Sequence, residues 1–268
     1  MSGYAAIPDI GAKRSQRMAA IVALVSREGS VDNADLAAAL GVSLSSIRRD
    51  LAVLADHGLV QRTHGGARRQ ASRPELPIRL RQQSPDAKEA IARETLKLIP
   101  RTRLAIGFTG GSTTALIAQR MAKGGYANAL VVTNSLPVAE LVPTYPQFRV
   151  LLTGGYLRPE SLEMVGAVSE ATLAAVTLDI AVVGVDGISA DGITTHDPVE
   201  GRTNAAMIGR ARQVIVVTDG SKVGRQTEAL MAPLDQVHVL VTDQSAPPPA
   251  LSEIAQAGVR LIQVAAPA

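Results

Sequence analysis

The chain of 268 residues contains no cysteine. This absence excludes disulfides, thiolate zinc sites and a cysteine nucleophile, and it fits a reducing compartment such as the cytoplasm. Tryptophan is also absent and aromatic residues make up only 2%, although 46% of the residues are hydrophobic. The core must therefore be built from Val, Leu, Ile and Ala, a composition that suits an α/β sheet buried on both faces.

Long apolar segments are absent as well. No apolar run approaches the roughly 18 to 20 residues that a membrane-spanning helix needs. The first residues, M-S-G-Y-A-A-I-P-D, lack the basic and apolar regions of a signal peptide. We therefore expect a soluble, cytoplasmic protein with no membrane partner.

The net charge of +3 is distributed unevenly along the chain. Residues 1–74 hold 10 Lys and Arg against 6 Asp and Glu, a balance of +4, whereas the rest of the chain holds 17 against 18, a balance of −1. A basic N-terminal part joined to a neutral body is typical of a nucleic-acid-binding module attached to a second domain.

The first 69 residues predict a short tail (1–12) followed by a small domain (13–69). Apolar residues recur at helical spacing between residues 15 and 27, and a second short helix follows Asp32. Ser43 is a suitable N-cap for a third helix that ends near Gly58. Residues 59–69 combine β-branched and basic residues around a Gly-Gly pair, which predicts a small hairpin, or wing.

Residues 70–87 are rich in Pro, Gln and Arg and predict a linker, and residues 88–268 predict a second domain. In that domain apolar strands alternate with helical patterns, as in a doubly wound, mostly parallel sheet. The expected strands are 104–108, 129–133, 149–153, 179–185, 214–218, 237–242 and 260–264. The expected helices are 86–99, 112–123, 135–142, 161–174, 199–212 and 251–257.

The third helix carries the strongest functional signal of the N-terminal domain. Its apolar residues follow helical spacing and should face the core: Leu44, Ile47, Leu51 and Leu54. The opposite face then presents Ser45 and Arg49, flanked by Ser46 and Arg48. Such a helix can enter the major groove of DNA, where Arg pairs with guanine. On this pattern alone, a helical hairpin that binds protein through a solvated arginine face stays an equal alternative.

The segment V-S-L-S-S-I-R-R-D-L-A-V-L-A-D-H-G-L-V-Q-R-T-H-G-G-A resembles the winged helix-turn-helix of the DeoR family of bacterial regulators, nearly residue for residue. The resemblance implies a DNA-reading helix that includes Ser43, Ser45, Ser46, Arg48 and Arg49. It also implies wing contacts by Arg62 and His64, although His64 can equally serve only to hold the turn. We expect Asp50 to form a local ion pair with a neighbouring arginine rather than to read bases.

In the second domain, A-I-G-F-T-G-G-S-T-T stands at the first strand-to-helix junction. Glycines let backbone N–H groups approach a ligand there, and the following helix N-terminus favours an anion. A tight turn with a Ser/Thr cap is the simpler reading of this motif alone. Three more strand ends carry polar motifs, at 132–135, 152–155 and 184–187, and Lys222 adds a cation at another. Together they predict a pocket for a small polyhydroxylated phosphate ester.

These motifs resemble the DeoR C-terminal sensor domain, which implies a fold similar to ribose-5-phosphate isomerase, a phosphorylated-sugar effector, an oligomer and repression of a carbohydrate operon. The resemblance implies no catalytic residue, metal or cofactor. The expected effector-binding residues are Gly110, Gly111, Ser112, Thr113, Thr114, Thr133, Asn134, Ser135, Gly154, Asp186, Glu200 and Lys222. Thr109 departs from the family, in which an Asp is frequent there.

Two alternatives remain from the sequence. A sugar-phosphate isomerase with an accessory DNA-binding head would need a carboxylate base and a group that stabilises an enediolate. Asp186, Asp191, Glu200 and Lys222 are nominal candidates. The other alternative is a DNA-binding protein whose C-terminal domain only oligomerises.

Overall fold

The computed structural model describes residues 14, 17, 18, 20–22, 24, 25, 28–56, 60–63, 65–68, 85–126, 128–142 and 145–265. The chain divides into two compact units, Met1–Gln83 and Ser84–Ala268, which we describe separately. Three sequence-based expectations lie outside the described residues: the tail 1–12, most of the linker (residues 70–84), and the role of His64.

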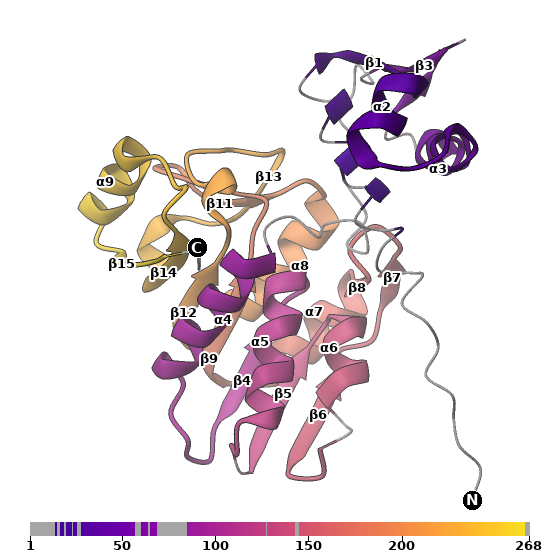
Figure 1. Cartoon of the computed structure of the whole chain (residues 1–268). Helices are drawn as coiled ribbons and strands as arrows, with labels where there is room; N and C mark the ends of the chain where they lie inside the picture. Colours follow the sequence, from indigo (N-terminus) through magenta and orange to yellow (C-terminus); the bar gives the residue numbers. More distant parts are fainter. Residues whose placement is uncertain are drawn as a thin grey trace, which may run out of the picture. The chain divides into compact units, whose positions relative to one another are not determined.

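The N-terminal unit contains helices and a small sheet (Figure 1). Its described residues between 14 and 28 are helical, and β1 (Ser30–Asp32), α2 (Asn33–Leu40), α3 (Leu44–Asp56), β2 (Gln61–Arg62) and β3 (Gly66–Arg68) follow. The strands form an antiparallel sheet in the order β1-β3-β2. The wing is therefore confirmed. The sheet also contains β1, which the sequence does not predict, because three residues between two helices are too few to show the alternating pattern of a strand.

The core of this unit is formed by apolar residues of all its helices. Ile47, Leu51 and Leu54 of α3 are at most 1% exposed and pack in one cluster with Ile21 and Leu36. The prediction that Leu44 also faces the core is wrong, because its side chain is 45% exposed. Leu44 is the first residue of α3, and the buried cluster takes its first α3 side chain one turn later, at Ile47.

The C-terminal unit is built on a parallel sheet of seven strands in the order β15-β14-β12-β9-β4-β5-β6. All seven predicted strands are confirmed within a few residues. Their bounds are β4 (Ala105–Phe108), β5 (Ala129–Thr133), β6 (Phe148–Leu152), β9 (Leu178–Gly184), β12 (Ala211–Val217), β14 (Val239–Asp243) and β15 (Arg260–Val264).

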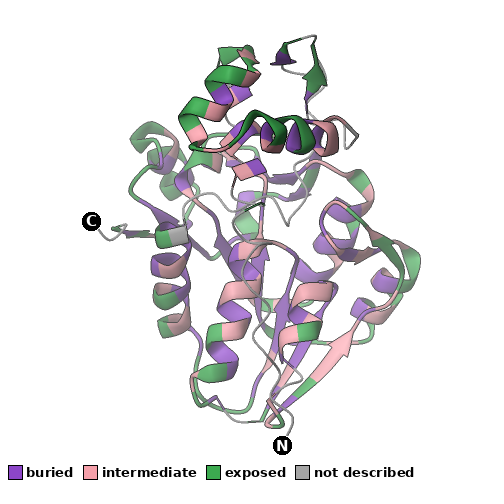
Figure 2. Ribbon diagram, turned by 45° about the vertical axis from the view of Figure 1, so that its right-hand side comes forward, coloured by how far each residue is buried: buried purple, intermediate pink, exposed green. Residues whose placement is uncertain are grey.

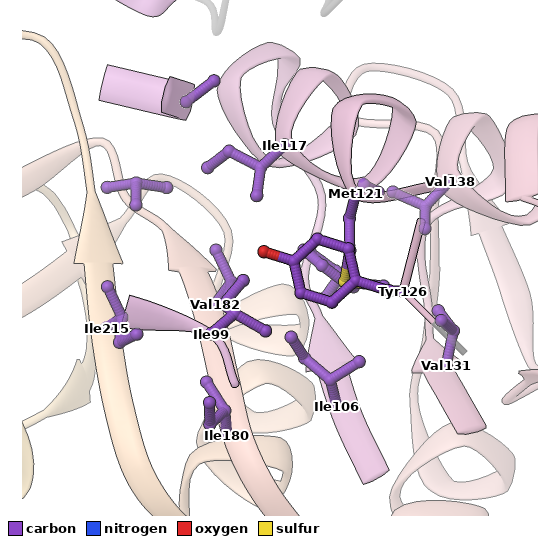
Figure 3. Close-up of a cluster of buried hydrophobic side chains, with 14 of the residues drawn as sticks. Ile99, Ile106, Ile117, Met121, Tyr126, Val131, Val138, Ile180, Val182 and Ile215 are labelled. Carbon is purple, nitrogen blue, oxygen red and sulfur yellow. The ribbon is translucent and has the colours of Figure 1, made fainter. Parts of the chain in front are cut away.

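Helices cover both faces of this sheet, as the doubly wound architecture requires. They are α4 (Pro85–Leu98), α5 (Ser112–Lys123), α6 (Leu136–Leu141), α7 (Ala167–Ala174), α8 (Pro198–Ile208) and α9 (Pro248–Gln256). In β9, Ile180 and Val182 belong to the apolar cluster with α4, α5 and α6 (Figure 3), whereas Ala181 and Val183 belong to the cluster with α7, α8 and α9. Successive strand residues therefore fill two cores, and the strands are largely buried (Figure 2).

Short strands at the sheet's carboxyl edge were not predicted. β7 (Tyr156–Arg158) pairs with β8 (Glu163–Val165), and β10 (Gly187–Ser189), β11 (Gly192–Thr195) and β13 (Ala229–Ala232) form an antiparallel sheet. The expected helix 161–174 is wrong in its first part, because 163–165 pair as a strand and the helix begins at Ala167. The expected helix 199–212 ends at Ile208, since β12 begins at Ala211.

Candidate DNA-reading helix and effector site

The first turn of α3 is organised by serine hydroxyls. The Ser46 backbone N–H donates to Ser43 Oγ at 3.2 Å, which confirms Ser43 as the N-cap residue. Ser43 Oγ also lies 2.9 Å from Ser45 Oγ and 3.0 Å from Ser46 Oγ. Ser43 and Ser45 are exposed and Ser46 is half-buried. The start of the helix therefore presents a cluster of hydroxyl groups to solvent.

Arg48 and Arg49 are both exposed, and within the described residues neither forms an ion pair. Asp50, the next residue, is 1% exposed and accepts from Arg14 Nε at 3.0 Å and Arg17 Nε at 2.7 Å. Asp50 therefore forms an ion pair with arginine as expected, but the prediction of a neighbouring partner is wrong, because Arg14 and Arg17 precede it by 36 and 33 residues and belong to the first helix. Asp50 thus helps to hold α3 in place, while the exposed face keeps two uncompensated positive charges.

The wing adds further positive charge. Arg62 on β2 is exposed, and Arg68 on β3 is exposed and donates from Nε to Gln61 Oε1 at 2.9 Å. Arg62 pairs in register with Ala67 of β3, and the arginine side chain itself is exposed to solvent. This leaves the guanidinium available to a phosphate backbone.

In the C-terminal unit, the loop between β4 and α5 has the geometry of an anion cradle. Gly111 occupies the N-cap position of α5 with φ of 119°, and no side chain caps the helix there. A Cβ at Gly110 would overlap the Glu163 carboxylate, and one at Gly184 would lie 2.6 Å from the Gly110 carbonyl oxygen. A side chain at either position would therefore displace its neighbours. Among the described residues, no side chain caps the N–H groups at the start of α5.

Thr109, which replaces a frequent Asp of the resembled family, is fully buried and ties two strand ends together. Its Oγ1 accepts from the Gly184 N–H at 3.0 Å and lies 3.3 Å from the Gly110 carbonyl oxygen, to which it donates. The hydroxyl therefore supports the shape of the loop. A carboxylate at this position would accept from the Gly184 N–H but could not donate when ionised.

Asn134, at the end of β5, joins three elements. Its Nδ2 donates to Glu163 Oε2 on β8 and to Asn204 Oδ1 on α8, both at 2.9 Å. All three side chains are at most 3% exposed. Within the described residues, Asn134 Oδ1 and the neighbouring Ser135 Oγ are buried and have no hydrogen-bond partner. These two atoms are the unfilled polar positions of the site.

A second group of polar side chains surrounds Thr195 on β11. Thr195 Oγ1 lies 2.7 Å from Glu200 Oε1 and 3.0 Å from Asp186 Oδ2. Lys222 Nζ donates to Asp186 Oδ1 at 3.2 Å and to the Val185 carbonyl oxygen at 2.8 Å. On the other side, Arg158 Nη1 donates to Glu200 Oε2 at 3.1 Å. Two buried carboxylates are thus each held by a cation and by one shared hydroxyl.

Glu163 connects the two groups. Burial raises the pKa of its carboxyl well above the ordinary value, and the negative charge of Glu200 raises it further, while hydrogen bonds from Asn204 and Asn134 oppose the shift. Glu163 also packs directly against Gly110. Glu163 thus contacts the loop at Gly110 directly and is linked to the group around Thr195 through the negative charge of Glu200.

Not every predicted site residue belongs to this network. Thr133 Oγ1 donates to the Phe108 carbonyl oxygen at 2.7 Å and accepts from the Ser135 N–H, so it braces two strand ends. Thr113 and Thr114 are buried within α5, and Thr114 Oγ1 donates to the Gly111 carbonyl oxygen. Gly154, with φ of 72°, accepts from Ser169 on α7. Asp191 is exposed and outside the network, whereas the other residues nominated for an isomerase, Asp186, Glu200 and Lys222, lie within it.

Four network residues were missed by the sequence analysis: Arg158, Glu163, Thr195 and Asn204. Glu163 lies in a segment whose pattern predicts a helix, and Asn204 lies in the middle of α8. Arg158 and Thr195 belong to short strands whose partners are set by tertiary pairing. Only Arg158 carried a local signal, because it follows the predicted Gly154-Gly155 turn by a few residues.

Comparison with known proteins identifies two domains in this chain. Residues 17–73 match the DeoR-like helix-turn-helix domain, and residues 83–244 match the DeoR C terminal sensor domain. The second match alone covers more than half of the chain.

Curated relatives align over most of their length. The chain is 35% identical over 240 residues to the "Glycerol-3-phosphate regulon repressor" of Escherichia coli (strain K12), covering 88% of this chain and 93% of the relative. It is 32% identical over 256 residues to the "Putative aga operon transcriptional repressor" of Escherichia coli O157:H7, covering 93% and 94%. Both relatives are named as repressors.

Among solved structures, D-ribose-5-phosphate isomerase in complex with phospho-erythronic acid is similar over 57% of each chain, with 19% identity and a TM-score of 0.39. A likeness of this extent says nothing about activity. The described residues include no helix long and apolar enough to cross a membrane.

Proposed function

The chain belongs to the DeoR family, and from that premise we propose that it is a transcriptional repressor of a carbohydrate operon. It binds an operator through α3 and the wing, and a phosphorylated sugar modulates that binding. We further propose that it acts in the cytoplasm as a homo-oligomer with its DNA-binding domain at 13–69 and its sensor domain at 88–268. The observation that carries the proposal is the joint match to a DeoR-like helix-turn-helix and a DeoR sensor domain.

DNA reading is assigned to the exposed start of α3. Arg49 and Arg48 offer guanidinium groups that form no ion pair within the described residues, so no internal contact must be broken when they meet guanine. The serine hydroxyls of the first turn supply donors and acceptors for bases or phosphates. Arg62, together with His64, would lie along the phosphate backbone. A dimer would then read two half-sites an integral number of helical turns apart.

This assignment is tested on duplexes selected from a random library by the full-length protein. Arg49→Ala should weaken binding to the selected duplex by about 1–3 kcal/mol, because one base contact is lost. Arg49→Lys keeps the charge and should lose specificity while retaining nonspecific affinity. Arg260→Ala removes an exposed arginine of the sensor unit and serves as the control. Unchanged binding by Arg49→Ala would refute the DNA-reading role.

Effector binding is assigned to the carboxyl edge of the sheet. The uncapped N-terminus of α5 would receive the phosphate. Ser112 is the first residue of that helix, and its hydroxyl forms no hydrogen bond among the described residues. Asn134, Ser135, Asp186, Glu200 and Lys222 would contact the sugar. The unpartnered Asn134 Oδ1 and Ser135 Oγ support this, because sugar hydroxyls donate to such atoms.

Thermal shift of the full-length protein against sugar phosphates tests the effector site, with glycerol-3-phosphate and hexose and pentose phosphates as ligands and the free sugars as controls. A true effector at about 100 times its Kd should stabilise the fold by about 2.7 kcal/mol. Ser112→Asp places a carboxylate where the phosphate would bind; it should keep the fold, since an acidic residue suits a helix N-terminus, and abolish the shift. Ser112→Asn is the neutral control. A full shift with Ser112→Asp would refute the phosphate cradle.

A further inference from the structure

A cavity lies in the sensor unit, away from the candidate effector site. It has a volume of about 560 Å³, within the range of small-molecule sites. α4, α5 and the segments that follow them line it with Glu89, Arg93, Leu96, Lys97, Arg101, Arg120, Lys123, Gly124 and Tyr126. These two helices pack side by side on one face of the sheet (Figure 1).

The cavity lies at the end of α5 opposite to the anion cradle. Arg120 and Lys123 belong to the last turn of α5, whereas Ser112 begins that helix. A helix of 12 residues is about 18 Å long. A ligand in this cavity therefore cannot also contact the N–H groups at the start of α5, and the two sites can be tested independently.

Positive charge in the cavity exceeds what its surroundings compensate. Five cationic side chains line it, and two have carboxylate partners at 2.7 Å: Arg120 with Glu89, and Lys97 with Glu94. The C-termini of α4 and α5 each contribute about half a negative charge, which offsets about one of the three remaining cations. Arg93 and Lys123 are exposed and form no ion pair within the described part of the chain.

We propose that this cavity binds a small anion that carries at least two phosphate groups. Arg93 and Lys123 can each take a phosphate without giving up an internal partner, and guanidinium groups bind phosphate oxygens in a bidentate manner. Leu96 and Tyr126 form an apolar floor. The Tyr126 hydroxyl donates to the Leu96 carbonyl oxygen at 2.8 Å, and Arg101 lies 5.2 Å from the ring centroid. The Tyr126 ring therefore already has a cationic partner in Arg101, so recognition of the anion rests on its phosphate groups.

Calorimetric titration of the full-length protein with pyrophosphate tests the proposal, with sulfate at the same ionic strength as the reference anion. The double variant Arg93→Ala/Lys123→Ala should weaken pyrophosphate binding by about tenfold or more, because two charge-assisted contacts are lost. Both side chains are exposed and unpaired, so the melting temperature of the double variant should stay near that of the parent. Arg260→Ala, which removes an exposed arginine outside the cavity, should leave pyrophosphate binding unchanged.

Three results would overturn the proposal. Pyrophosphate that binds no tighter than sulfate would mean that the cations only solvate the helix ends. Loss of binding in Ser112→Asp, but not in the double variant, would place the anion in the cradle of α5. Displacement of pyrophosphate by a random-sequence duplex, together with weaker binding of that duplex by Arg93→Ala/Lys123→Ala, would assign the cavity to a DNA backbone instead of a small molecule.

Discussion

The two candidate sites of this molecule differ in how far their polar side chains are exposed and in whether those side chains are bonded to others. At the start of α3, Arg48 and Arg49 are exposed and form no ion pair within the described residues. At the carboxyl edge of the sheet, Glu163 and Glu200 are at most 5% exposed and bonded to other side chains. Under the proposed function, the face of α3 would bind DNA without breaking internal ion pairs, whereas the effector site is held by its own network and would exchange some of those contacts for a ligand.

The largest difference should appear in stability. Glu200→Ala removes the buried carboxylate that joins Arg158 to Thr195, and we expect it to lower the free energy of unfolding by about 3 kcal/mol. Arg49→Ala should change it by less than about 0.5 kcal/mol. Denaturant unfolding of both variants measures the contrast. Equal effects would mean that the sensor network does not contribute to the fold as its burial indicates.

The next largest effect concerns the close approach of Gly110 to Glu163. Gly110→Ala forces the loop or the carboxylate to move, which we expect to cost about 1–3 kcal/mol and to reduce the effector-induced thermal shift. Gly209→Ala is the matched control, because Gly209 has a helical φ of −64° and its Cβ would meet only an ordinary contact at 3.5 Å. That control should be neutral or slightly stabilising. A neutral Gly110→Ala would show that the loop is not fixed by Glu163.

A smaller, pH-dependent effect follows from the raised pKa of Glu163. Because burial and Glu200 raise it, the folded state holds this proton more tightly than the unfolded state. Stability from this group is therefore present below the ordinary glutamate pKa of about 4.3 and is lost as pH rises towards the folded pKa. Glu163→Gln mimics the protonated form. Its melting temperature relative to the parent should rise between about pH 4 and neutrality.

Glu163→Gln and the parent differ only at position 163, so their melting temperatures are compared at each pH. A difference that stays constant over this pH range would contradict protonation of Glu163 in the folded state. The same scan on Glu228→Gln is a control, because a backbone hydrogen bond and His196 lower the pKa of that exposed carboxyl. The melting temperature of this variant relative to the parent should therefore fall, and not rise, as the pH increases.

The smallest expected effect is at Leu44. Leu44→Ala should change the free energy of unfolding by less than about 0.5 kcal/mol, because the side chain is largely exposed. Ile47→Ala, one turn further along α3, should cost about 2–5 kcal/mol because it empties a fully buried position. Similar losses at both positions would mean that Leu44 packs in the core after all.

The sequence predicts the parallel sheet well because each of its strands contains a short run of apolar residues, a pattern that buried parallel strands share. It fails for β7, β8, β10, β11 and β13, which are three or four residues long and owe their conformation to partners distant in the chain. The site follows the same division. Asn134, Asp186 and Lys222 stand at or just after strand ends and were predicted, whereas Glu163 and Asn204 reach the site only through the packing of β8 and α8.

The central claim is that one phosphorylated sugar, bound at the carboxyl edge of the sheet, changes the affinity of α3 for its operator. The most direct measurement is the operator dissociation constant of the full-length protein with and without the sugar phosphate found by thermal shift. We predict a change of about 5- to 150-fold in the parent and none in Ser112→Asp. An operator affinity that is unchanged by every sugar phosphate that binds would contradict the account.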